Sequence, residues 1–471
     1  MCRIRHACCF HETFASALLA RDFRPAARLR HPAGPWARGQ AGGRGDSHQP
    51  ARVAEAIHWM KRSTPLMMRK LTCYCSAAAL AAGASLSGAV MADEARIAEL
   101  EERIEALEAS PATGDGIRFG GALRFNVRYD DTDAGSAIRD RGGDINLDTF
   151  RVNVDGRQDR VTFAAEYRWY PDFDQHFLHT GWVGYDFTDT TTARIGQQRA
   201  AFGLQPYQSN NFWFSSNYYV GLEDKLAIGI NVDHEQGPLK LDLGFFSNPA
   251  SGSAGSSGHY STEVAPAADC GAGADAGLCN EEMNQLYARA AYTFDHGPDA
   301  ATEFGISGMA GKLRNTLTGD RGDSWAAAAH LNGQYQRWNV MAQFASYEHD
   351  PRNPDGANDD IINMSIQGFT GFGTPSEADT FILNVAYDLP VSFGPVSNLR
   401  FYNDYSTVRS KSDSSRNTEQ NVTGMSITAG NIFTYVDIIR GKNQPFVGGQ
   451  TMVGDDGSWE TLYNINIGYY F

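Results

Sequence analysis

From residue 116 to the end of the chain, apolar and polar residues alternate with a period of two in short segments. In the first segment, Ile117, Phe119 and Leu123 share one face, whereas Arg118 and Arg124 share the other. Successive side chains of a β-strand point to opposite faces, so this alternation predicts strands with one apolar and one polar face. No run of 18 apolar residues follows residue 92, so the pattern predicts no transmembrane helix in this part of the chain.

We count sixteen such segments, with eighteen strands as the alternative count. They begin near residues 116, 146, 160, 178, 190, 226, 238, 284, 301, 322, 337, 376, 395, 420, 432 and 458. Connections after the even-numbered segments are short, and those after the odd-numbered segments are usually longer, as at 200–225 and 248–283. Short turns at one end and long loops at the other are typical of outer-membrane barrels. The sequence therefore predicts an all-β fold, a 16-stranded antiparallel transmembrane β-barrel over residues 113–471.

The last strand strengthens this prediction. Tyr463, Ile465, Ile467, Tyr469 and Phe471 share one face. A terminal Phe preceded by alternating apolar residues resembles the C-terminal signal of outer-membrane barrels that the barrel assembly machinery reads. Tyr469 and Phe471 are therefore the candidate assembly signal, although an ordinary amphipathic edge strand at a chain end has the same pattern.

The chain before residue 93 resembles a secretory signal preceded by extra sequence. Residues 1–66 are rich in Arg, Ala, His, Pro and Gly and show neither strand nor helix periodicity. Residues 67–92 follow the order of a secretory signal peptide, with a basic pair, an apolar run and small residues at the cleavage site. Because such a signal stands at the N-terminus, we expect the natural start at Met67 or Met68. Residues 1–66 are then a non-native upstream extension, and a genuine long presequence is the alternative.

Residues 93–112 form a short amphipathic segment between the signal and the barrel. Ile97, Leu100, Ile104 and Leu107 recur at steps of three and four residues, with Glu and Arg between them. This pattern predicts a short helix with a coiled-coil seam. Two heptads are marginal alone, so the segment is either a small trimeric zipper or a frayed N-terminal helix.

Removal of residues 1–92 changes the charge of the chain. Thirteen of the 40 Lys and Arg and four of the 55 Asp and Glu lie there, which leaves 27 basic and 51 acidic side chains and a net charge of −24. Phosphates need basic neutralisation, so this balance argues against a nucleic-acid partner. Only two of the seven cysteines, Cys270 and Cys279, remain. An even number in an exported chain makes them a candidate loop disulfide.

Two stretches resemble a known family. They are Arg194-Ile-Gly-Gln-Gln-Arg-Ala-Ala-Phe-Gly-Leu204, and Ser209-Asn-Asn-Phe212 followed by Tyr218-Tyr-Val-Gly-Leu-Glu-Asp224. They are similar to the outer-membrane porin family that includes the phosphate-selective porins O and P. The resemblance implies a trimeric barrel of sixteen strands with one loop folded inward. Lysine is sparse after residue 92, which weakens a carry-over of phosphate specificity.

The chemistry of a channel lies in its lining. If the apolar face points outward, six arginines point inward and are candidates for an anion ladder: Arg118, Arg124, Arg128, Arg151, Arg168 and Arg194. Guanidinium groups bind carboxylate and phosphate with a fixed fork of donors. The alternative is that they pair with neighbouring acids such as Asp155 and Glu166 and only solvate the lumen.

The long 200–225 connection is the candidate constriction loop. It is the third outward connection, which folds into the barrel in porins of this general shape. Its candidate residues are Tyr207, Phe212, Trp213, Phe214, Tyr218, Tyr219, Glu223 and Asp224. The aromatic side chains either form a slide for a sugar or aromatic solute or pack the loop against the barrel wall, and Glu223 and Asp224 face Lys225 or the inward arginines.

These observations predict a porin of the Gram-negative bacterial outer membrane. We expect a homotrimer in outer-membrane lipid that lets small hydrophilic solutes diffuse passively, with weak anion selectivity. A solute-specific porin for phosphate, organic acids or sugars is the first alternative, and an outer-membrane barrel enzyme or structural barrel is the second. We expect no enzymatic activity, cofactor or metal, and His176 and His179 fall in a predicted surface loop.

Overall fold

The computed structural model describes residues 116–471, apart from 133–136, 249–259, 269, 272–275, 367–370, 450 and 455–456. The predicted upstream extension, signal peptide and helical segment at 93–112 lie outside the described residues. No helix within the described residues is long and apolar enough to cross a membrane.

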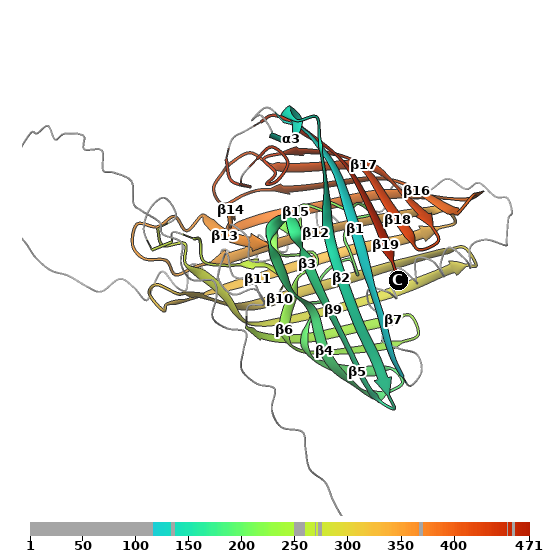
Figure 1. Ribbon diagram of the computed structural model, residues 1–471. Coiled ribbons are helices and arrows are strands. Elements are labelled where there is room, and N and C mark those ends of the chain that lie inside the picture. Colours follow the sequence, from blue (N-terminus) through green and yellow to red (C-terminus); the bar gives the residue numbers. More distant parts are fainter. Residues whose placement is uncertain are drawn as a thin grey trace, which may run out of the picture. The chain divides into compact units, whose positions relative to one another are not determined.

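Sixteen antiparallel strands close into a barrel in which β1 pairs with both β2 and β19 (Figure 1). The predicted fold class and the count of sixteen are confirmed. The barrel strands are β1 (Gly116–Asp131), β2 (Asp144–Gln158), β3 (Val161–Tyr170), β4 (Gln175–Thr188), β5 (Thr191–Arg199), β6 (Leu226–Gln236), β7 (Leu239–Asn248), β9 (Asn280–Gly297), β10 (Ala300–Asn315), β11 (Arg321–Tyr335), β12 (Trp338–Asp350), β15 (Glu377–Phe393), β16 (Val396–Arg409), β17 (Thr418–Ala429), β18 (Ile432–Lys442) and β19 (Glu460–Tyr470).

The connections follow the predicted parity. At one end, tight turns join successive strands, with left-handed residues such as Asp159 between β2 and β3 and Gln336 between β11 and β12. The C-terminus lies at this same end, because Phe471 pairs its backbone with Gly121 near the start of β1. The other end carries the long connections, including the one between β5 and β6. In outer-membrane barrels the short-turn end is the periplasmic one.

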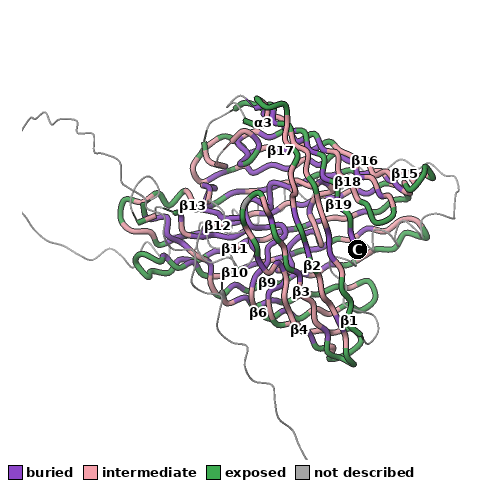
Figure 2. Tube along the Cα trace, viewed as in Figure 1, coloured by how far each residue is buried: buried purple, intermediate pink, exposed green. Residues whose placement is uncertain are grey.

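The two faces of each strand differ in kind. Outward positions are apolar and exposed, as at Phe119 (78%), Ile306 (66%) and Ile195 (61%). Inward positions are buried and polar, as at Thr162 and Asn384. Along the strands, buried segments alternate with less buried ones (Figure 2). An apolar outer belt with a polar lumen is the arrangement that a barrel surrounded by lipid requires.

Three short strands outside the barrel were not predicted. β8 (Thr262–Val264), β13 (Ile361–Ile366) and β14 (Phe372–Pro375) form an antiparallel sheet in the order β14-β13-β8. They belong to the long β7–β9 and β12–β15 connections, and Figure 1 shows β13 and β14 at the end of the barrel away from the C-terminus. This sheet therefore ties two long loops together.

The remaining short elements are α3 (Ala137–Asp140), η2 (Pro171–Phe173) and η3 (Tyr218–Val220).

The prediction that His176 and His179 lie in a surface loop is wrong. Both belong to β4, and His179 is buried on the inner side. A register shift between β3 and β4, at Glu166 and Tyr167, interrupts the alternation of β4 at this point. Because of this shift, the first residues of β4 do not alternate with a period of two, and the sequence pattern does not identify them as a strand.

Candidate functional site

The 200–225 connection lies inside the barrel and is bonded to the wall opposite its own strands. The backbone N–H of Gly203 donates to Ser307 Oγ of β10 (2.9 Å), and that of Leu204 donates to Gln343 Oε1 of β12 (2.8 Å). Asn384 Nδ2 of β15 donates to the carbonyl of Gln208 (2.8 Å). The first half of the loop therefore crosses the lumen and is held there by polar side chains.

The second half is held by two carboxylates and two further polar groups. Asp404 of β16 accepts hydrogen bonds from Asn210 N (2.7 Å), Asn210 Nδ2 (2.8 Å) and Asn211 Nδ2 (2.7 Å). Asp437 of β18 accepts from Phe212 N (3.4 Å). Ser216 N donates to Ser406 Oγ (2.9 Å), and Gln420 Nε2 donates to Phe214 O (2.7 Å). Buried backbone groups that leave regular structure need such partners.

Glu223 organises the loop from within. Its carboxylate accepts four hydrogen bonds, from Gln208 N (2.9 Å), Ser209 Oγ (3.0 Å), Ser215 N (2.9 Å) and Ser215 Oγ (2.6 Å). Burial raises the pKa of Glu223 to about 7, against the lowering effect of these donors. The neighbouring Asp224 instead faces a wall arginine, with Arg199 Nη2 at 2.7 Å.

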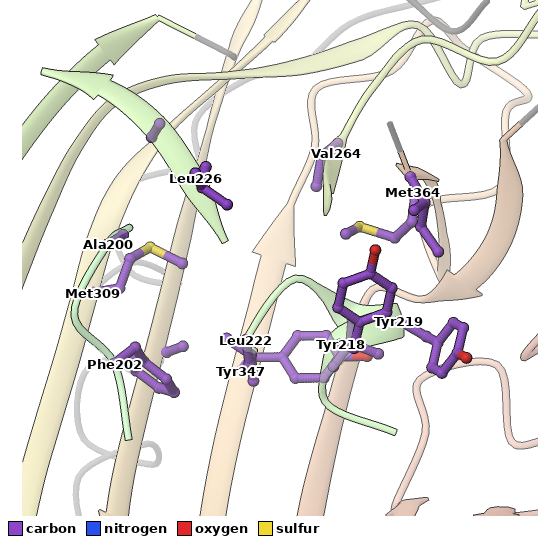
Figure 3. Close-up of a cluster of buried hydrophobic side chains, with 14 of the residues drawn as sticks. Ala200, Phe202, Tyr218, Tyr219, Leu222, Leu226, Val264, Met309, Tyr347 and Met364 are labelled. Atoms are coloured by element: carbon purple, nitrogen blue, oxygen red, sulfur yellow. The ribbon is translucent and has the colours of Figure 1, made fainter. Parts of the chain in front are cut away.

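Part of the predicted aromatic constriction is packing. Tyr218 and Tyr219 are buried in an apolar cluster with Leu222, Leu226 and Met364 (Figure 3). Phe214 stacks on Tyr218 with ring centroids 4.3 Å apart. These rings fix the loop in place, as the packing alternative from the sequence states.

Other loop rings reach the arginine side of the lumen. Phe212 lies 5.3 Å from the guanidinium of Arg124, and Trp213 lies 5.4 Å from that of Arg128. Tyr207 lies 4.8 Å from Arg199. The loop thus spans the barrel from the hydrogen-bonding wall of β10–β18 to the arginines of β1 and β5.

Each candidate ladder arginine has an acidic partner. The pairs are Arg118–Asp155 (2.7 Å), Arg124–Asp148 (2.8 Å), Arg128–Asp130 (2.5 Å), Arg151–Glu166 (3.5 Å), Arg168–Glu166 and Arg194–Asp233 (3.0 Å). All six lie on the inward face that the alternation predicts. Their charges are largely compensated, so the ladder as a selectivity device stays a prediction.

A cavity of about 330 Å³ remains between this wall and the first half of the loop. Residues of β2–β7, β9 and β10 line it, together with Gln205, Pro206 and Tyr207 of the loop. Its charged lining comprises five basic and four acidic side chains: Arg168, Arg194, Arg199, Lys240 and Arg289, and Asp155, Glu166, Asp242 and Glu303. The cavity is therefore polar, nearly balanced in charge and narrowed from one side by the loop.

The sequence reasoning missed Arg199, Lys240 and Arg289 as lining residues. Arg289 stands between outward Ala288 and Ala290 in β9, and its guanidinium pairs with Glu303 (2.6 Å) and donates to Gly203 O (2.8 Å). The alternation itself could have found it, because Arg289 stands between the apolar Ala288 and Ala290.

The long loops are further joined at their own end of the barrel. Cys270 and Cys279 form a disulfide, with Cα atoms 5.3 Å apart. Buried Lys225 pairs with Glu282, and Lys411 Nζ donates to the carbonyls of Arg416 and Met452 (both 2.6 Å). The two lysine contacts therefore tie long connections to neighbouring segments, whereas the disulfide closes a ring within the β7–β9 connection.

The candidate assembly residues lie at the opposite end. Tyr469 and Phe471 are about half exposed on the outer surface, and their rings stack with centroids 6.3 Å apart. Their role in assembly stays a prediction.

Solved structures of similar fold are outer-membrane channels. An anion-selective porin from Comamonas acidovorans is 14% identical, with a TM-score of 0.49, and the match covers 76% of this chain and 99% of that one. The outer membrane channel DcaP of Acinetobacter baumannii is 12% identical, with a TM-score of 0.49, and the match covers 77% and 99%. Salmonella typhi OmpF, in complex with daunomycin, is 12% identical, with a TM-score of 0.49, and the match covers 76% and 98%.

No family model matches the chain, and no curated protein matches its sequence. The likeness to the solved structures concerns the fold alone, and the assignment of the site rests on the geometry described above.

Proposed function

We propose that this chain is a porin of the bacterial outer membrane that lets small hydrophilic solutes diffuse passively. The observation that carries the proposal is the polar cavity between the arginine-bearing wall and the inward loop, inside a closed barrel with an apolar belt. A barrel of sixteen strands leaves an aqueous lumen, and a loop folded inward sets its width.

The paired arginines support weak selectivity. Five basic side chains against four acidic ones leave the cavity with a small positive excess. Guanidinium groups that already bind carboxylates offer fewer donors to a passing anion. We therefore infer a general-diffusion porin with weak anion preference, and a solute-specific porin for phosphate, organic acids or sugars is the second candidate.

An enzyme of the barrel type fits the structure less well. A lipid-cleaving barrel needs a Ser and a His together on the outer surface. Outward His176 lies 2.8 Å from Tyr167 Oη, and His234 lies 2.8 Å from Thr191 Oγ1. Neither histidine is hydrogen-bonded to a serine in the described part of the chain, so neither supports nucleophilic catalysis.

The test is the single-channel conductance of the purified, folded protein in planar bilayers. We expect open channels in groups of three, with a small anion preference from the reversal potential. A correctly folded barrel without conductance would overturn the porin proposal and favour the enzyme or structural alternatives.

The selectivity proposal has its own variants. Arg194→Ala leaves Asp233 unpaired in the lumen, so the reversal potential should move toward cations by roughly a factor of two in permeability ratio, the size of a single screened charge. Arg314→Ala is the matched control, because Arg314 is exposed on the outward face and pairs with Glu281. A preference that Arg194→Ala leaves unchanged would show that the lining arginines do not set selectivity.

A further inference from the structure

The outer surface of β16 and β17 departs from the apolar belt. Near the short-turn end the belt contains a row of aromatic side chains, Trp338, Tyr387 and Phe401, which face one another across β12, β15 and β16. Trp338 and Tyr387 are in ring contact, with centroids 4.8 Å apart. Aromatic rows of this kind mark the edge of the lipid-facing band.

The next outward row is apolar at both ends and polar in the middle. Strand register places Val340, Val385, Asn403, Thr423 and Ile438 side by side on β12, β15, β16, β17 and β18. Asn403 and Thr423 are exposed. Asn403 follows Phe401 by two residues, which is about 5 Å along the membrane normal for a strand tilted by roughly 45°. The polar pair therefore lies inside the lipid-facing band.

Two rows above it repeat the pattern. The first contains Ala342, Leu383, Tyr405, Asn421 and Arg440, and the second contains Phe344, Phe381, Thr407, Glu419 and Lys442. In both rows β12 and β15 carry apolar side chains, whereas β16, β17 and β18 carry polar or charged ones. On this side of the barrel, the apolar belt is therefore shorter at its long-loop edge.

The polar side chains within the belt form one network. Asn403 Nδ2 donates to Thr423 Oγ1 (2.7 Å) and Asn421 Oδ1 (3.2 Å), and Asn421 Nδ2 donates back to Asn403 Oδ1 (3.1 Å). Each amide oxygen keeps a second lone pair, and the Thr423 hydroxyl donates to no acceptor among the described residues. The network thus presents both donors and acceptors outward.

Charged side chains continue the network toward the long-loop end. Tyr405 Oη donates to Glu419 Oε2 (3.1 Å), and Lys442 Nζ lies 3.3 Å from Glu419 Oε1. The guanidinium of Arg440 stacks on Trp459 at 5.2 Å. Both signs of charge are present within a few residues of each other.

We propose that this face, defined by Asn403, Asn421 and Thr423 with Tyr405 and Glu419 above them, is where a second copy of the chain packs in a trimer. Lipid tails offer no hydrogen-bonding group to amides in the band. Around a threefold axis, donors on this face can meet acceptors on the same face of the neighbouring copies, and its positive charges can meet their negative ones. The inference extends the proposed function, from which it takes the membrane location of the barrel.

The first experiment is crosslinking in bilayers. Cys270 and Cys279 are joined to each other, so Asn403→Cys adds a free thiol on the described outer surface. A short bismaleimide should link Asn403→Cys subunits into dimers. Ala329→Cys is the matched control, because Ala329 is exposed outward on β11, which is separated from β16 by β12 and β15. Equal linking of the two variants, or linking of the control alone, would overturn the proposal.

The second experiment replaces the network with apolar side chains. The triple change Asn403→Leu, Asn421→Leu and Thr423→Val should lower the temperature at which trimers dissociate on a mild-detergent gel, while the separated barrels stay folded. Ala327→Leu with Ala329→Leu should leave that temperature unchanged. Trimers of the triple variant that resist heat as well as those of the unaltered protein would overturn the proposal. An unaltered protein that is monomeric in vesicles, with lipid on this face, would overturn it as well.

The two proposals fail separately. Conducting barrels that do not crosslink through Asn403→Cys retain the porin and exclude this interface. Subunits that crosslink through Asn403→Cys but do not conduct retain the interface and exclude the porin.

Discussion

The two walls of the lumen use different chemistry. The wall of β1–β5 carries arginines paired with carboxylates, and Arg168, Arg194 and Arg199 of this wall line the cavity. The wall of β10–β18 carries hydroxyl, amide and carboxylate groups, and these are bonded to the inward loop. The β10–β18 wall therefore supplies most of the hydrogen bonds to the constriction, and the arginine wall borders the cavity, although Arg199 also pairs with Asp224 of the loop.

This difference shows that inward polar side chains serve two purposes, to hold the loop and to line the lumen. Side chains that bind fixed backbone donors and acceptors become structural, because a buried backbone group without a partner is costly. Long charged side chains form ion pairs with one another beside the water of the lumen, so their charges can still act on a passing solute. Four predictions test this division.

The largest expected effect is at the buried centre of the arginine wall. Glu166 lies between Arg151 and Arg168, 3.5 Å from the former, and His179 Nδ1 lies 3.3 Å from it. Glu166→Gln leaves two buried guanidinium groups without their anion, which should cost about 3–5 kcal/mol of barrel stability. The temperature of barrel unfolding on a heat-modifiable gel measures this loss. The exposed pair Lys240–Glu235 supplies the control, Glu235→Gln, for which no measurable change is expected.

Release of the loop should come next. Asp404→Ala removes three hydrogen bonds to Asn210 and Asn211 and should weaken loop anchoring by about 3 kcal/mol. Cleavage of the folded barrel within 205–222 by chymotrypsin should then become fast, and single-channel conductance should rise. Thr428→Val is the control. Thr428 accepts a hydrogen bond from Ser397 through its backbone carbonyl, which the substitution keeps. A loop that resists protease in Asp404→Ala would show that the apolar cluster alone holds it.

A smaller effect is expected from pH. The pKa of Glu223 is raised in the folded loop to about 7 from an ordinary value of 4.5. A raised pKa means that the folded loop binds this proton more tightly than the unfolded loop. Its contribution to loop stability is fully present below about 4.5 and is lost as the pH rises through about 7.

Current noise from loop motion should therefore increase between pH 5 and pH 8. The Glu223→Gln variant, which cannot titrate, should show no such increase across this range. Equal pH dependence in both proteins would assign the effect to another group.

The smallest effect on conductance is expected from the disulfide. Cys270→Ser with Cys279→Ser removes a cross-link between two residues nine positions apart in the sequence. The loss of this constraint on the unfolded connection should cost about 2–3 kcal/mol of local stability. The β7–β9 connection should become more sensitive to protease, whereas conductance should not change, because the cavity lining does not include this segment. A conductance change would place these loops in the solute path.

Much of the wall could be predicted from particular residues. Arg118, Arg124 and Arg168 were assigned inward because each alternates with apolar neighbours, and the strand register agrees. The start of β4 was missed because a register shift breaks the period at Glu166 and Tyr167. The bonds of Gly203, Asn210 and Ser216 were beyond the sequence, because their partners stand 104, 194 and 190 residues away.

The amino-acid pattern is enough to predict the barrel, the pairing of neighbouring strands and the side of each strand that faces the lumen. Local alternation and turn residues decide these features, since side-chain direction has period two and tight turns join neighbours. Only the folded barrel shows which inward groups hold the loop, which arginines meet which acids and where the outer belt is interrupted. These features depend on register and closure between distant strands, and no local pattern carries that information.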